Sequence, residues 1–153
     1  MKINDVIKSG QAYSESKAAV LNIVYTEKLL SEKISAILKN YDLSTEQFNV
    51  LRILRGQKGS PASMQLIQER MLSKTSNTTR LVDKLLAKKL VTRKVCPGNR
   101  RMMEVNITES GLALLEKADP DIESFESSFN ALSEPEFETF NRLIEKFRAH
   151  LLK

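Results

Sequence analysis

The residues best suited to recognising another molecule are basic and polar, and they gather between residues 72 and 101. This stretch holds nine lysines and arginines against a single acid, Asp83, which gives it a net charge of +8. Residues 1–71 carry a net charge of +3 and residues 102–153 a net charge of −6. So dense a positive patch favours a polyanionic partner. The acidic C-terminal block argues against a protein that adsorbs to membranes through charge.

A helix is predicted from about Ser76 to Lys88, within this basic stretch. Apolar residues recur at helical spacing and define its inner face: Leu81, Val82, Leu85 and Leu86. Its polar start supplies the candidate contacts Thr75, Ser76, Asn77, Thr79 and Arg80. Asparagine and arginine make paired hydrogen bonds to adenine and guanine, and hydroxyls bond to bases or phosphates. Lys84 and Lys88, further along, are better placed for phosphates.

A β-hairpin is predicted directly after this helix. Apolar and polar residues alternate over residues 91–96 and again over 102–107, and Pro97-Gly98-Asn99 between them is typical of a tight turn. The tip carries Asn99, Arg100 and Arg101, and arginines there are placed to enter an adjacent minor groove or to grip the phosphate backbone. Two short helices joined by a polar turn and followed by this hairpin predict a winged helix-turn-helix.

Further helices are predicted on both sides of this motif. A helical apolar pattern runs from about Gln11 to Asn40, after a short helix at residues 4–9. Capping residues mark later helix starts, and these are Ser44 with Gln47, Ser63, Thr108, and Ser133 with Glu136. Residues 59–63 are predicted to form a turn, and Pro120 is expected to interrupt or kink the helix that begins after Thr108.

The predicted fold is mainly α with a small β-hairpin, in a single domain over residues 1–153. Residues 41–108 form the winged helix-turn-helix, and residues 1–40 and 109–153 supply flanking helices. So small a middle region cannot cover the apolar faces of both the first and the last helix. We therefore expect these faces to pair in a homodimer.

The sequence favours no enzyme class and predicts no cofactor. It has no phosphate-binding glycine motif and no serine or cysteine nucleophile with a histidine nearby. Cys96 and His150, the only residues of their kinds, lie too far apart in sequence to predict a metal site. Cys96 is interpreted as a strand residue, with a redox role as the alternative. No apolar stretch has the length of a membrane span or the pattern of a signal peptide, so a cytoplasmic location is expected.

Three stretches resemble the MarR (multiple antibiotic resistance regulator) family of winged-helix transcription factors. They are LSTEQFNVLRIL (43–54), TSNTTRLVDKLLAKKLVTR (75–93) and NRRMMEVNITESG (99–111). The resemblance implies a homodimer whose first and last helices interlock and whose two winged helices bind a near-palindromic operator. It also implies that a small ligand often modulates binding, from a pocket between the dimerisation and DNA-binding parts.

Two positions depart from that family. Asn99 stands where the family usually has an aspartate that supports the neighbouring arginine through its charge. Lys89 stands where the family often ends the recognition helix with glycine, and a left-handed backbone at a lysine costs about 1 kcal/mol.

The sequence therefore predicts a dimeric, sequence-specific DNA-binding transcriptional regulator, of the repressor type, with a small-molecule effector. The alternative from another class is a winged-helix module that docks an acidic protein partner on the same basic patch.

Overall fold

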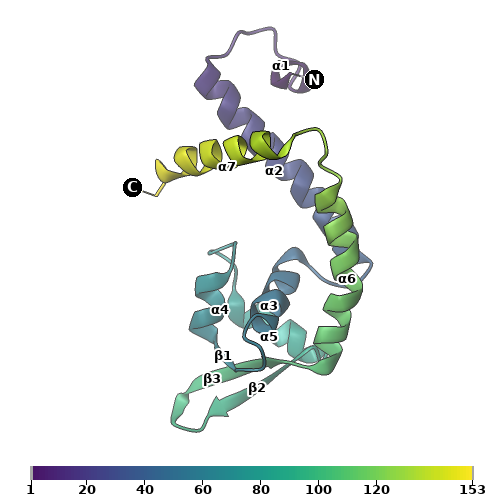
Figure 1. Cartoon of the computed structure of the whole chain (residues 1–153). Helices are drawn as coiled ribbons and strands as arrows, with labels where there is room; N and C mark the ends of the chain where they lie inside the picture. Colours follow the sequence, from purple (N-terminus) through teal and green to yellow (C-terminus); the bar gives the residue numbers. More distant parts are fainter. Residues whose placement is uncertain (1, 153) are drawn as a thin grey trace. The chain divides into compact units, whose positions relative to one another are not determined.

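The computed structural model describes residues 2–152, and for residues 100 and 101 it describes the backbone alone. Figure 1 shows the order of its helices and strands. The chain divides into two compact units, Met1–Ala118 and Asp119–Lys153, and helix α6 (Glu109–Ser127) runs through the boundary. No helix in the described part is long and apolar enough to cross a membrane.

The first unit contains the winged helix and the helices that precede it. Its elements are α1 (Ile3–Val6), α2 (Glu15–Lys39), α3 (Thr45–Arg55), β1 (Ala62–Ser63), α4 (Met64–Arg70), α5 (Thr78–Ala87), β2 (Val91–Cys96), β3 (Asn99–Ile107) and the start of α6. The second unit contains the rest of α6 and α7 (Glu134–Ala149). The predicted class, mainly helical with a small β-hairpin, is confirmed.

Hydrogen bonds between residues three apart start several helices of the first unit. At α3, Ser44 Oγ accepts from the Gln47 amide, and Gln47 Oε1 accepts from the Ser44 amide, both at 3.1 Å. Ser63 Oγ starts α4 and Thr108 Oγ1 starts α6, each by accepting an amide hydrogen bond at 3.1 Å. These bonds satisfy amides that have no partner within the first helical turn. The predicted capping residues of these helices are confirmed.

The second unit begins its last helix in the same way. Glu136 Oε2 accepts from the Ser133 amide at 2.8 Å and from the Ser133 hydroxyl at 2.7 Å. The amide bond first, and then the hydroxyl bond, hold the pKa of Glu136 below its ordinary value, because both favour the charged carboxylate. Just before this start, the rings of Phe125 and Phe129 meet edge to face, with centroids 5.2 Å apart.

Some predicted boundaries are wrong by a few residues. Helix α2 begins at Glu15 rather than near Gln11, because Ser14 caps it and accepts a hydrogen bond from the Lys17 amide at 3.3 Å. Pro120 lies inside α6 and does not interrupt it. The proline is exposed, so water can satisfy the carbonyl that loses its amide partner one turn earlier.

A three-stranded antiparallel sheet, in the order β1-β3-β2, forms the wing and its base. The predicted hairpin is confirmed. It pairs Val91 with Ile107 at its base, and its register shifts between Val95 and Cys96 near the tip. Strand β1 falls in the segment predicted as a turn, and Ala62 pairs there with Val105. Two residues are too few to show strand alternation, so this long-range pairing left no pattern in the sequence.

The core of the first unit gathers apolar side chains from its helices and its sheet. Those with no measurable exposure include Leu38, Val50, Leu51, Ala62, Ile67, Val82, Leu85, Val105 and Leu115. Burying a leucine or valine contributes about 1.5–3 kcal/mol, so α5 is held firmly by its inner face. Leu81 and Leu86, predicted with Val82 and Leu85 as that inner face, are only half-buried.

Candidate nucleic-acid interface

The first turn of α5 determines which of its polar side chains face outward. Asn77 is the N-cap rather than a helical residue, and its Oδ1 accepts a hydrogen bond from the Arg80 amide at 3.0 Å. The helix therefore starts two residues later than predicted, and Ser76 lies in the turn before it. The Asn77 oxygen is already engaged, and its amide donors remain for an outside partner.

Thr78 shows how the α4–α5 turn is fixed against this helix. Its side chain is 6% exposed, and its hydroxyl donates to Gln68 Oε1 on α4. Gln68 Nε2 in turn donates to the Lys74 carbonyl at 2.7 Å. One carboxamide thus joins α4, the turn and α5. No pattern in the sequence indicates Gln68, because its two contacts are set by the tertiary structure.

The predicted contact residues of α5 lie mostly on its exposed side. Thr78, Val82 and Leu85 are buried at helical spacing. The candidates that are exposed are Thr75, Asn77, Thr79, Arg80 and Lys84, and Ser76 is half-buried. The structure therefore brings hydroxyl, amide, guanidinium and ammonium groups together over the first two turns of one helix face. Such a face has the width and chemistry to enter a major groove.

Lys88 lies differently from the other predicted contacts. Its ammonium is 3.0 Å from Asp42 Oδ2, donates to the Asp42 backbone carbonyl, and is 3.4 Å from Gln47 Oε1. The Lys88 side chain is 29% exposed. Its predicted phosphate contact stays a prediction, but the ammonium already has acceptors within the protein.

Lys89 follows the C-cap of α5 and has a left-handed backbone, with φ 60°. The Lys89 amide donates to the Leu86 carbonyl at 2.9 Å, and the Leu90 amide donates to the Leu85 carbonyl at 3.0 Å. These two bonds form a Schellman motif, whose left-handed position is usually glycine. The strain expected from lysine at this position is therefore present in the fold.

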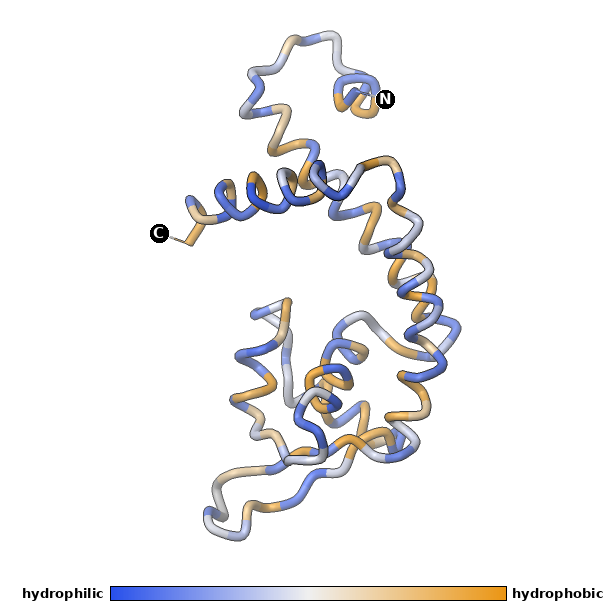
Figure 2. The backbone as a smooth tube through the Cα atoms, viewed as in Figure 1, coloured by the Kyte–Doolittle hydropathy of each residue, from blue (hydrophilic) through white to orange (hydrophobic). Residues whose placement is uncertain are grey.

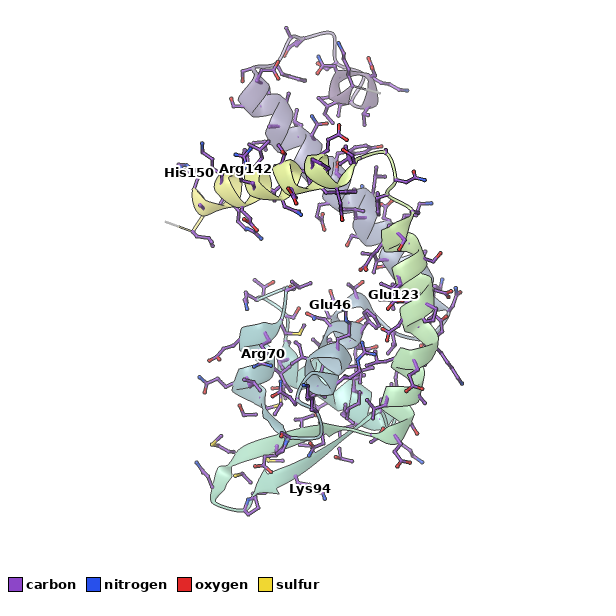
Figure 3. All side chains as sticks on the ribbon, in the orientation of Figure 1. Glu46, Arg70, Lys94, Glu123, Arg142 and His150 are labelled. Carbon is purple, nitrogen blue, oxygen red and sulfur yellow. The ribbon has the colours of Figure 1, made fainter. Side chains whose placement is uncertain are left out.

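The wing is joined to α5 by an ion pair and carries further basic residues. Arg93 of β2 lies 2.7 Å from the Asp83 carboxylate. Lys94 is exposed on the same strand (Figure 3). Asn99 is exposed at the start of β3. Arg100 and Arg101 belong to β3, but their side chains lie outside the described part, so their predicted contacts stay predictions.

A solvent-accessible cavity of about 1050 Å³ lies within the first unit, next to this surface. Its wall includes Ser31 and Ser35 of α2, the start of α3 at Ser44 and Thr45, and Leu72 of the α4–α5 turn. The α5 residues Lys84 and Lys88 complete it. Helix α5 and its C-cap therefore place two lysines in the wall of a cavity large enough for a small organic molecule.

Two helices carry exposed apolar rows. On α2 these are Val20, Val24, Tyr25 and Leu29, and on α7 they are Phe140, Leu143 and Phe147. Figure 2 shows apolar and polar residues alternating along both helices, as in helices that bury one side. Exposed apolar patches of this kind mark interaction surfaces.

The two remaining candidates for chemistry are single residues, Cys96 and His150. Cys96 is half-buried near the wing tip, and His150 ends α7. Within the described residues, no group of three histidines, cysteines or acids is close enough to hold a metal ion. The chemistry that the surface offers is hydrogen bonding and positive charge.

Comparison with known proteins points to one family. Residues 41–102 match the sequence model described as the MarR family. The solved structure of a MarR transcription factor from Planctomyces limnophilus is 30% identical, with a TM-score of 0.66 over 88% of this chain and 98% of that one.

Two curated relatives are similar over most of the chain. The transcriptional regulator MhqR of Bacillus subtilis is 29% identical over 118 residues, which are 76% of this chain and 80% of that protein. The transcriptional repressor IacR of Pseudomonas putida is 29% identical over 116 residues, which are 75% of this chain and 68% of that protein. Both are helix-turn-helix regulators by name.

Proposed function

The chain belongs to the MarR family of winged-helix, DNA-binding transcriptional regulators, and we propose that it represses transcription by binding a near-palindromic operator as a homodimer. In this proposal it acts in the cytoplasm, as a binding protein rather than an enzyme. Residues 41–108 bind DNA, and residues 1–40 and 109–153 form the dimer. One of its relatives, IacR, is named a transcriptional repressor, which supports repression rather than activation.

One observation carries the DNA-binding surface: the polar face of α5 lies next to a wing in a block of net charge +8. Thr79 and Arg80 are exposed beside buried Thr78, so they occupy the part of the helix that meets base edges. Lys84 and the wing arginines supply phosphate contacts around them. An acidic protein partner would also suit the charge, but it gives no reason for a helix face composed of base-reading side chains.

The test begins by selecting bound duplexes from a random-sequence pool with the wild-type protein. Binding to the selected duplex is then measured for a double variant, Arg80→Ala with Arg101→Ala. We expect a loss of at least about tenfold, since a paired guanine contact alone is worth about 1–3 kcal/mol. Wild-type binding should also weaken steeply with salt, because phosphate contacts release counterions.

A matched control removes the same charge elsewhere. Lys17→Ala with Lys117→Ala takes two positive charges from outside residues 72–101, and both side chains are exposed. This control should bind the selected duplex nearly as wild type does. Equal losses in both double variants would mean that net charge, rather than the α5 face, governs binding. Failure to bind any duplex at low salt would favour the acidic protein partner.

The homodimer rests on the apolar rows of α2 and α7. Phe140 and Leu143 are each 51% exposed, and Val24 is 61% exposed. A second copy would cover such rows, and a near-palindromic operator requires two-fold symmetry. Phe140→Glu with Phe147→Glu should shift sedimentation from dimer to monomer. Glu138→Gln, an exposed polar change on the same helix, should leave the dimer intact. A monomeric wild type at micromolar concentration would contradict this part of the proposal.

The cavity beside α5 is proposed as the site of a small effector. Ser35 of α2 and Thr45 of α3 approach within 3.3 Å through their hydroxyls in its wall. The cavity reaches Lys84 and Lys88, so an occupant would act directly on the recognition helix. An effector found by a thermal-shift screen should lower affinity for the selected duplex.

Filling the cavity tests this assignment. Ser35→Phe should abolish the thermal shift and leave DNA binding without effector unchanged. Ser16→Phe, an exposed change at the start of α2 and outside the cavity wall, serves as the control. An effector that still shifts the melting temperature of the Ser35→Phe protein would bind outside the cavity, which would contradict this assignment.

A further inference from the structure

Lys88 connects the end of the recognition helix to two other helices. It is the C-cap residue of α5, and its ammonium contacts three oxygens. Two of them, the carboxylate at 3.0 Å and the backbone carbonyl, belong to Asp42, and the third is Gln47 Oε1 at 3.4 Å. An ammonium has three protons to donate, so these acceptors match its full capacity.

The partners of Lys88 lie where α2 ends and α3 begins. Asp42 has a left-handed backbone, φ 53°, and the Leu43 amide donates back to the Leu38 carbonyl at 3.1 Å to close α2. Gln47 is 5% exposed and belongs to the capping box of α3. Lys88 therefore supports the end of one helix and the start of the next.

The C-terminal end of α5 is also held by residues that follow it in the sequence. The Thr108 hydroxyl donates to the Lys89 carbonyl at 2.9 Å, and the Thr108 amide donates to the Leu90 carbonyl at 3.0 Å. The C-terminal end of α5 is thus fixed to the α2–α3 turn and to the start of α6. Its N-terminal end carries Thr79 and Arg80. A small tilt of α5 about its fixed C-terminal end would therefore displace the Thr79 and Arg80 side chains at its other end.

We propose that Lys88 is a positioning residue for DNA recognition: its ammonium, held by Asp42 and Gln47, sets the angle of α5 and does not contact phosphate. A phosphate oxygen would have to displace one of three acceptors, one of which is a backbone carbonyl. Lys84, one turn earlier, is exposed and keeps the role of phosphate contact.

The Asp42→Asn variant decides whether Lys88 positions α5 or contacts phosphate, because the two roles predict opposite changes in DNA affinity. If Lys88 positions α5, this variant loosens the helix and weakens binding to the duplex selected by the wild-type protein, by about threefold or more. If Lys88 contacts phosphate, the variant frees its ammonium and removes a negative charge, so that binding stays equal or becomes tighter. Asp42→Asn changes an exposed carboxylate only, so the protein should keep its fold, as checked by circular dichroism.

Lys88→Gln and the double variant complete the cycle. Positioning predicts that Lys88→Gln weakens binding and that adding Asp42→Asn weakens it no further, because the Asp42 carboxylate acts through the Lys88 ammonium, which Lys88→Gln has already removed. It also predicts an unchanged slope of log affinity against log salt, whereas Lys84→Gln should reduce the slope by about one contact. A reduced slope for Lys88→Gln, additive effects of the two variants, or wild-type affinity in Asp42→Asn would each overturn the proposal. Should Lys88→Gln not fold, Asp42→Asn alone still decides.

Discussion

The Arg93 guanidinium lies 2.7 Å from the Asp83 carboxylate and joins the wing strand β2 to the recognition helix α5. Asp83 is the only acid between residues 72 and 101, so this pair also neutralises one charge in the basic block. The Asp83 side chain is 52% exposed and that of Arg93 is 31% exposed. Exposed ion pairs contribute at most about 1 kcal/mol to folding, so the effect of this pair on DNA binding should exceed its effect on stability.

Asp83→Asn should therefore make DNA binding less selective. The change frees Arg93 for phosphate, so affinity for a scrambled duplex should rise and the ratio of selected to scrambled affinity should fall. The salt slope should increase by about one contact. Glu116→Gln removes the same charge from an exposed site on α6 and should leave the ratio unchanged. A preserved ratio in Asp83→Asn would show that Arg93 does not reach the DNA.

Substitutions at Asn77 separate its role in the helix from its role at the surface. Asn77→Ala removes the cap on the Arg80 amide and should lower the free energy of unfolding by about 1 kcal/mol. Asn77→Asp keeps the capping oxygen, so its urea unfolding curve should resemble that of wild type. It loses the amide donors and adds a negative charge, so its affinity for the selected duplex should fall. Wild-type affinity in Asn77→Asp would exclude a contact between Asn77 and DNA.

Short-range patterns explain why much of the fold was predictable from sequence. The capping box of Ser44 and Gln47 depends on residues three apart, and the spacing of Val82 and Leu85 depends on one helical turn. Each of these is fixed by local geometry, whatever the rest of the chain does. For the same reason the sequence predicts which α5 side chains are buried at Val82 and Leu85, although Leu81 and Leu86, predicted with them, are only half-buried.

Long-range contacts explain what the sequence did not reveal. Lys88 and Asp42 are separated by 46 residues, and nothing in the periodicity of either helix pairs them. Gln68 reaches Thr78 across ten residues and a turn whose path is set by packing. Strand β1 likewise exists only because Ala62 meets Val105. The residues that position the candidate site were therefore harder to predict than those that form its surface.

Lys89→Gly should stabilise the protein. The left-handed backbone at Lys89, φ 60°, disfavours any residue with a Cβ, so glycine should raise the free energy of unfolding by about 0.5–1 kcal/mol. Lys89→Ala removes the same charge but keeps the Cβ, and it should give no such gain in urea unfolding. An equal gain in both variants would assign the effect to charge rather than to backbone strain.

Gly111→Ala should have the opposite effect, although alanine normally favours a helix interior by up to about 1 kcal/mol. A Cβ at Gly111 would clash with the Leu90 carbonyl oxygen and lie 2.7 Å from Ile107 Cγ1. The Leu90 carbonyl is a backbone group that cannot turn aside, so α6 must shift away from the end of α5. Overpacking of this kind costs about 1–3 kcal/mol, which urea unfolding measures directly.

The control for this variant is Gly98→Ala in the wing turn, where an added Cβ meets nothing within 4 Å. It should leave the unfolding curve almost unchanged. Gly111→Ala should also weaken binding to the selected duplex, because Leu90 immediately follows the recognition helix and moves with its end. Unaltered stability in Gly111→Ala would mean that α6 does not pack this closely on α5. Lost stability with unaltered DNA affinity would mean that the shift is absorbed by α6 without tilting α5.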